Sequence, residues 1–398
     1  MEIKLQKFRR TMEAILRYDP KSMKVAGAPC LASETWNTTT LTHHPLHANL
    51  GTFPRRLPSP PLPVTIPPVP KPSPVSRRNF LSAALAGSAA TLAGAQMPQS
   101  SPDEWAPERT QAALHSATGT SLVLLGTGAG PVEGRPRRMT SHVLVSNGAA
   151  YIVDCGLGVT NQLARTGIPF SAVRSIFITH HHPDHNVEYG PFLLLRWVGH
   201  NTQAPSAYGP PPLIQMTRDY LRSVDATIRF WSEDFQYPPL KVDDVHEITG
   251  SGHVMKDKNV RVTSVLVQHP PVRPALGYRF DFADRSIAFS GDTVPLEAVA
   301  RMAQGADVLV HEAIDMAVMD RMERLNHDPV QYKIAMHHMR ADHSPIEDVG
   351  RIAQQAGVKT LVLSHLAPSI GIPDETWRAA AARHFKGNII VGHDLMVI

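Results

Sequence analysis

The sequence has few of the features of a disulfide-rich or membrane-spanning protein. Cys30 and Cys155 are its two cysteines, and only Cys155 remains once the first 95 residues are removed. We therefore expect no disulfide within the mature chain, and we expect Cys155 to be a small buried residue. No run approaches the ~18 apolar residues of a transmembrane helix, so we expect no stable membrane insertion.

The excess of positive charge is confined to the N-terminal leader. The 39 basic and 35 acidic residues include 12 basic and 4 acidic ones in residues 1–95, so residues 96–398 carry 27 and 31, a net charge of −4. A protein segment without excess positive charge, such as 96–398, has little long-range attraction for the phosphate backbone of a nucleic acid. On this ground we expect no nucleic-acid partner.

The leader resembles an export segment preceded by coil. Nine prolines lie between Pro58 and Pro74, a density that favours extended polyproline-like chain and no packed element. Residues 76–81 read SRRNFL and are followed by an uncharged Ala/Gly-rich stretch and the A-x-A triplet 93–95, which is typical of a twin-arginine signal. The alternative is a short buried helix after a chance arginine pair.

We accordingly predict a Pro-rich leader over 1–75, a signal peptide over 76–95, export by the twin-arginine translocase and a periplasmic location. Seventy-five residues are long for a segment before such a signal. We therefore hypothesise that translation begins near Val75.

The remaining body, 96–398, alternates short apolar runs with helical patterns. Runs such as 121–125, 175–179 and 286–290 predict strands, and 159–165 and 346–355 predict helices. Strands come in two batches, each followed by helices. This order favours an α/β fold with two sheets face to face and helices outside both, a four-layer αββα sandwich in a single domain. Residues 201–258 show weak periodicity, and we interpret them as a lid or insert.

A histidine cluster follows the strand at 175–179. Residues 180–185 read HHHPDH and contain the pattern H-x-H-x-D-H. His180 and His182 leave the strand on the same side and can hold one ion, while Asp184 and His185 can reach a second. Imidazole and carboxylate donors without thiolate suit Zn²⁺ or a similar divalent ion.

Further candidate ligands stand at the ends of later strands. These are His269, Asp292 and His365, and the glycine before Asp292 lets the backbone come close to a metal. Any one of these histidines is more often a satisfied or surface residue, but together they predict a site for two divalent ions. Such a pair lowers the pKa of a bound water toward ~7 and so supplies a nucleophile at neutral pH.

These motifs resemble the metallo-β-lactamase superfamily, and Leu125–Gly128, Val310–Ala313 and Asp342–Ser344 resemble its ribonuclease Z branch. Asn186–Gly190 is similar to the zinc-dependent arylsulfatases of that branch. The resemblance implies two Zn²⁺ ions, the first bound by His180, His182 and His269 and the second by Asp184, His185 and His365, with Asp292 bridging. It implies catalytic roles for Asp184, His343 and Glu312, with His343 as general acid oriented by Glu312.

Four functions compete. The sequence favours an exported dinuclear zinc hydrolase of small esters, such as an aryl sulfate, a phosphodiester or a lactone. A ribonuclease Z-like endoribonuclease that processes tRNA is the first alternative, and the export signal, the charge and the lack of a Gly/Pro-rich tRNA-gripping arm argue against it. A β-lactamase and a metal-binding module without turnover are the others. The sequence does not decide whether the protein forms a homodimer.

Overall fold

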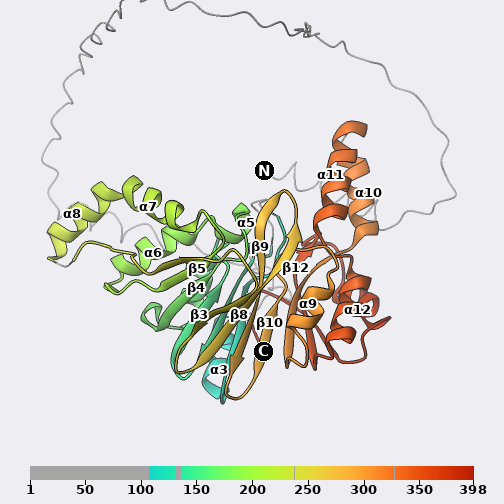
Figure 1. Ribbon diagram of the computed structural model, residues 1–398, viewed down its shortest axis with the longest axis horizontal. Helices are drawn as coiled ribbons and strands as arrows, with labels where there is room; N and C mark the ends of the chain where they lie inside the picture. Colours follow the sequence, from blue (N-terminus) through green and yellow to red (C-terminus); the bar gives the residue numbers. More distant parts are fainter. Residues whose placement is uncertain (1–106, 131–135, 237, 327) are drawn as a thin grey trace, which may run out of the picture. The chain divides into compact units, whose positions relative to one another are not determined.

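The computed structural model describes residues 107–130, 136–236, 238–326 and 328–398. The predicted leader and signal segment lie outside these residues. The described part confirms the four-layer αββα sandwich: two sheets face one another, with helices on their outer faces (Figure 1). Within the described residues, no helix has both the length and the apolar character needed to cross a membrane.

Across the described ranges, each sheet has seven strands. In hydrogen-bonded order the first sheet is β14 (Met396–Val397), β1 (Ser121–Gly126), β2 (Ser141–Ser146), β3 (Ala149–Val153), β4 (Val173–Phe177), β5 (Ser206–Gly209) and β6 (Val245–Glu247). The second sheet is β13 (Asn388–Val391), β12 (Thr360–Ala367), β11 (Val308–Ile314), β10 (Ser286–Phe289), β9 (Val272–Phe282), β8 (Val260–His269) and β7 (Gly252–Lys256).

Strand β1 shows how the sequence builds the layers. It is apolar along most of its length, and successive side chains point to opposite faces of the sheet. Leu122 and Leu124 belong to the core between the two sheets, whereas Val123 and Leu125 belong to the core between the first sheet and its helices. A strand buried on both faces needs a continuous apolar run, which is why 121–125 lacks the polar alternation of an exposed strand.

Two sets of helices complete the sandwich. The first sheet packs against α4 (Val159–Thr166), α6 (Tyr189–Val198), α7 (Leu213–Ser223) and α8 (Asp225–Phe235), with α3 (Pro107–Ser116) beside α4 and β14. The second sheet packs against α9 (Glu297–Met302), α12 (Ile346–Ala356) and α13 (Asp374–Ala382). A 3₁₀ turn (Phe170–Ala172) and the short α5 (Pro183–Asn186) lie in connections.

The segment 201–258 differs from the predicted lid. Its strands β5 and β6 extend the first sheet, and β7 pairs with β8 in the second, so much of the segment is structural. These strands have only three to five residues. That length is too short for a period-2 pattern to stand out among prolines and tyrosines.

The sequence did not predict the helical pair α10 (Met316–Asn326) and α11 (Pro329–Asp342), which projects beyond the sheets in Figure 1. The N-cap of α11 is Asp328, whose side chain accepts hydrogen bonds from the backbone N–H groups of Val330 and Gln331. Pro329 fits the first helical position, which needs no backbone donor. This Asp-Pro start is the signal that sequence reasoning overlooked.

Candidate metal centre

The ends of four strands bring all seven predicted ligands together at one edge of the sandwich. His180 and His182 follow β4, and Asp184 and His185 lie on α5, which begins directly after them. His269 ends β8, Asp292 follows β10, and His365 lies in β12. In the part of the chain that the structure describes, four overlapping donor groups have ligand atoms within 4.8 Å of one another: His180–His182–His269, His180–His185–Asp292, Asp184–His185–His365 and Asp292–Glu312–His343–His365.

Three imidazoles form the first donor group. Nδ1 of His182 lies 3.1 Å from Nε2 of His180 and 2.9 Å from Nε2 of His269. Nδ1 of His269 donates to the carbonyl oxygen of Asp342 at 2.9 Å. This bond leaves Nε2 of His269 with a free lone pair, the form in which imidazole binds a metal.

Asp184, His185 and His365 form the second group. Nδ1 of His185 donates to Oδ2 of Asp154 at 2.8 Å, so its Nε2 turns a lone pair toward Oδ2 of Asp292, 3.3 Å away. This Nε2 is buried and has no hydrogen-bond partner among the described residues. Two electron-rich atoms face one another there, an arrangement that a cation between them stabilises. The residues therefore fit a metal ion.

Asp292 stands between the two groups. Its Oδ2 lies 3.1 Å from Nε2 of His365 and 3.8 Å from Nε2 of His180. Burial opposes its charge, but His185 and His365 outweigh burial and hold the pKa of Asp292 well below its usual range. In turn, Asp292 and Asp154 raise the pKa of His185 well above its ordinary value against the effect of burial. The centre thus stabilises positive charge at the position that a divalent ion would occupy.

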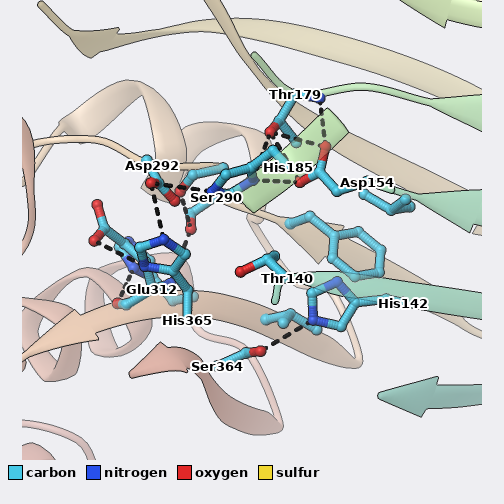
Figure 2. Close-up of a pocket in the computed structure, with 15 residues that line it drawn as sticks. Thr140, His142, Asp154, Thr179, His185, Ser290, Asp292, Glu312, Ser364 and His365 are labelled. Atoms are coloured by element: carbon cyan, nitrogen blue, oxygen red, sulfur yellow. Dashed lines mark hydrogen bonds and ion pairs between the residues drawn. The ribbon is translucent and has the colours of Figure 1, made fainter. Parts of the chain in front are cut away.

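Asp154 and Thr179 hold the second group from behind. Figure 2 shows Asp154, Thr179 and His185 on one side of a small cavity, with Asp292, Glu312 and His365 on the other. Oδ1 of Asp154 accepts the backbone N–H of Thr179 at 2.8 Å. Asp154 has φ 62°, a left-handed conformation that is uncommon outside glycine and that directs its carboxylate to these partners.

A β-bulge aims His365 into the centre. The pairing of β11 with β12 shifts register after Glu312, so that Ser364 and Leu366 have partners and His365 is the extra residue. His365 also has positive φ, at 46°. Bulges redirect side chains in this way, and the imidazole lies 3.3 Å from Oδ2 of Asp184.

The structure also places the predicted acid pair at the centre. Nδ1 of His343 lies 2.7 Å from Oε2 of Glu312, whose Oε1 accepts the backbone N–H of Thr293 at 2.6 Å. Burial lowers the pKa of His343, but the Glu312 carboxylate and Asp292 outweigh it and raise the pKa above its ordinary value. The pair is thus arranged as an oriented proton donor. Because His343 also lies in one of the donor groups, its role remains a prediction.

Other histidines have structural partners. Nε2 of His181 lies 2.7 Å from the carbonyl oxygen of Pro210, and Nδ1 of His311 lies 2.8 Å from that of Glu312. Cys155 is a buried free cysteine, as expected.

Sequence reasoning missed the groove beside the centre and a pair of residues on α11, of which His338 lines the groove. We call this groove of about 510 Å³ the site groove. Its polar lining includes His182, Asp184, Asp292, His343, His365 and His338, and its apolar lining includes Ile314, Met319, Met322 and Met339. On α11, Nδ1 of His338 donates to Oδ2 of Asp342. The i, i+4 spacing of the pair was the available signal.

Residues 150–366 match the β-lactamase superfamily domain. The chain therefore belongs to the metallo-β-lactamase superfamily. Ribonuclease Z from Mycobacterium bovis (strain BCG / Pasteur 1173P2) is 32% identical over 291 residues, which cover 69% of this chain and 96% of that protein. Ribonuclease Z from Mycobacterium sp. (strain KMS) is 34% identical over 282 residues, 69% of this chain and 94% of that protein.

Solved structures share the fold of this superfamily member. The metallo-β-lactamase fold protein YhfI from Bacillus subtilis superposes with TM-score 0.52 and 19% identity, covering 71% of this chain and 99% of that one. The short form of human tRNase Z gives TM-score 0.51 and 22% identity, covering 70% and 98%.

These relatives confirm the ribonuclease Z branch and correct two predictions. The small-ester hydrolase is wrong, because proteins matched over nearly their whole length are ribonucleases. The predicted absence of a nucleic-acid partner is wrong for the same reason. The first error arose because one metal-activated nucleophile can attack sulfur, phosphorus or carbonyl centres, so the ligand motifs do not rank substrates. The predicted closeness to arylsulfatases is not seen in these relatives.

Proposed function

We propose that the chain is a metal-dependent endoribonuclease of the ribonuclease Z type, which hydrolyses a phosphodiester bond of precursor tRNA. The observation that carries this proposal is the 32–34% identity over 94–96% of the length of ribonuclease Z proteins. The geometry supports it, because a groove lined by two donor groups and an oriented histidine suits hydrolysis of a charged phosphodiester.

The donor groups would hold two zinc ions. His180, His182 and His269 would bind one, and Asp184, His185 and His365 the other, with Asp292 between them. When bound, such ions supply an activated water and polarise the phosphoryl oxygens.

The chain's own residues would supply the proton for the leaving group and hold the ligand rings in place. Glu312 holds Nδ1 of His343, so Nε2 is the nitrogen left to face a substrate in the site groove. His343 would donate a proton from there to the leaving oxygen, which departs poorly as an alkoxide. The carbonyl of Asp342 and the carboxylate of Asp154 fix the rings of His269 and His185.

The net charge of the body is compatible with an RNA substrate. Its acidic residues include Asp184, Asp292 and Glu312, which are buried in the centre and project little field from the surface. Two divalent ions would add +4, as much as the net −4 that the sequence gives to residues 96–398. The sequence-based charge argument did not count these ions.

The test uses the full chain loaded with zinc and a labelled precursor tRNA that carries a 3′ extension. We expect one endonucleolytic cut that a chelator abolishes, and no cut by Asp292→Ala. Asp219→Ala, which changes an exposed carboxylate on α7, is the matched control and should cut normally. The proposal would be overturned if the wild-type protein hydrolyses nitrophenyl sulfate but leaves the precursor tRNA intact.

A further inference from the structure

The site groove has an apolar side that the metal centre does not use. A small cluster of buried apolar side chains lies there, separate from the cores of the sandwich layers. Ile314 and Met319 belong to this cluster, and Met339 packs against it. We call the four larger apolar side chains that line the site groove the apolar wall: Ile314, Met319, Met322 and Met339.

The apolar wall is connected directly to the predicted proton donor. Met339 lies on α11 about one turn before His343, the residue at which this helix ends. The backbone N–H of Ile314 donates to the carbonyl oxygen of Ser344, the residue after His343, at 3.0 Å. His343 and the apolar wall line the same groove of about 510 Å³. A substrate that receives a proton from His343 therefore places its neighbouring atoms against the wall.

The chemistry of the apolar wall favours a flat ring. Its thioether and alkyl side chains offer no strong hydrogen-bonding group. Methionine is flexible and polarizable, and its sulfur makes favourable contacts with aromatic rings. No Phe, Tyr or Trp among the described residues lines the groove, so the aromatic stacking that is usual in single-strand binding is not available. In a polynucleotide, the base is the part of each nucleotide that has flat apolar faces.

We propose that the apolar wall is a nucleobase subsite, which holds the base of the nucleotide that carries the leaving oxygen. The inference rests on the proposed function. In that reaction water adds to phosphorus, the bond from phosphorus to the leaving oxygen breaks, and this oxygen takes the proton of His343. Because the wall adjoins His343, the base of the same nucleotide lies against it. Contact with the ring faces requires a base without selecting one of the four.

The experiment compares three precursor tRNAs: one intact, and one abasic at each of the two nucleotides that flank the scissile phosphate. The products identify the leaving nucleotide, because it ends in a hydroxyl and the phosphate stays on the other fragment. For the zinc-loaded wild type, we expect kcat/KM to fall about tenfold when the base of the leaving nucleotide is missing, the upper range for a sulfur–aromatic contact. Loss of the other base should cost about threefold or less.

Three variants of α10 assign this effect to the wall. Met322→Ala removes one contact, so the tenfold effect of the missing base should shrink to about threefold. Met322→Leu keeps an apolar side chain of similar length and should stay close to tenfold. Leu325→Ala is the matched control, because Leu325 is 62% exposed on the same helix and does not line the site groove. It should retain the wild-type ratio.

Several results would overturn the inference and leave the proposed function standing. These are equal cutting of the intact and abasic precursors by wild type, an effect confined to the other nucleotide, and a Met322→Ala variant that retains the tenfold ratio. A general structural defect lowers both rates equally, so it also leaves that ratio unchanged. A wild type that cuts no precursor overturns both proposals.

Binding provides a second measurement, independent of turnover. The Kd of wild type should be about tenfold weaker for the abasic form of an uncleavable precursor, in which a methylene group replaces the leaving oxygen. Met322→Ala should reduce this difference as it does for kcat/KM. Equal Kd values of wild type for the two forms would show that the wall does not hold the base.

Discussion

At the residue scale, Asp292 is the carboxylate that lies between the two donor groups. One oxygen lies within 3.9 Å of ring nitrogens of His180, His185, His343 and His365. Its loss would remove the negative charge between two cations and leave their repulsion uncompensated.

We therefore predict that Asp292→Ala lowers zinc content from two ions to below one per chain, as measured by elemental analysis after dialysis. Asp219→Ala should keep two. If Asp292→Ala also keeps two tightly bound ions, the bridging position is wrong.

A second residue-scale prediction concerns His142, whose Nε2 lies 3.0 Å from Oγ of Ser364 behind the centre. Burial, followed by the nearby His185 and His365, lowers the pKa of His142 from 6.5 to about 3. Between pH 6.5 and about 3, His142 is protonated in the unfolded chain and neutral in the folded chain. The contribution of the neutral imidazole to stability is thus present above about pH 6.5 and is lost as the pH falls toward 3.

Urea unfolding at pH 6.5 and pH 5 should show this difference. From pH 6.5 to pH 5, the free energy of unfolding should fall by about 2 kcal/mol more in the wild type than in His142→Gln, which has no titrating group at this position. Equal losses in the two proteins would mean that His142 does not titrate in this range on unfolding.

At the element scale, α12 and α13 are in close contact at Gly350. A Cβ added there would lie 2.4 Å from the carbonyl oxygen of Ala381, far inside van der Waals contact. Gly350→Ala should force the helices apart and lower the free energy of unfolding by about 1–3 kcal/mol, the usual cost of overpacking. Thermal unfolding of the zinc-loaded protein measures this.

Gly250→Ala is the control for that comparison, because its Cβ would meet no atom within 4 Å. If both variants unfold at the wild-type temperature, the α12–α13 contact is looser than the structure indicates.

The elements also show which features could be predicted from sequence. β10 and the end of β4 are buried apolar runs, and the polar ligands that follow them, Asp292 and His180, were recognisable in the sequence. The bulge that turns His365 inward depends on the partner strand β11, so local pattern does not reveal it. α10 and α11 have exposed apolar residues such as Leu325 and Ile334, which blur the amphipathic pattern that marks a surface helix.

At the scale of the whole molecule, a separate proposal concerns the leader. We propose that residues 76–95 direct export of the folded protein through the twin-arginine pathway. Changing Arg77 and Arg78 to lysine should leave the precursor in the cytoplasm on immunoblots of fractionated cells. The same change at Arg109, an exposed arginine on α3, should leave export intact. Unchanged periplasmic accumulation of the first variant would refute the signal.

The central claim is that this centre cleaves RNA with His343 as proton donor. The most direct measurement is kcat/KM of wild type and His343→Ala on precursor tRNA and on bis-nitrophenyl phosphate, with zinc content determined in parallel. Nitrophenolate leaves almost unaided, whereas the ribose oxygen needs a proton. The variant should therefore lose ~10²–10⁴-fold on tRNA and little on the nitrophenyl ester, with two ions retained. Equal losses on both substrates together with loss of zinc, or a wild type that leaves the tRNA intact, would contradict the account.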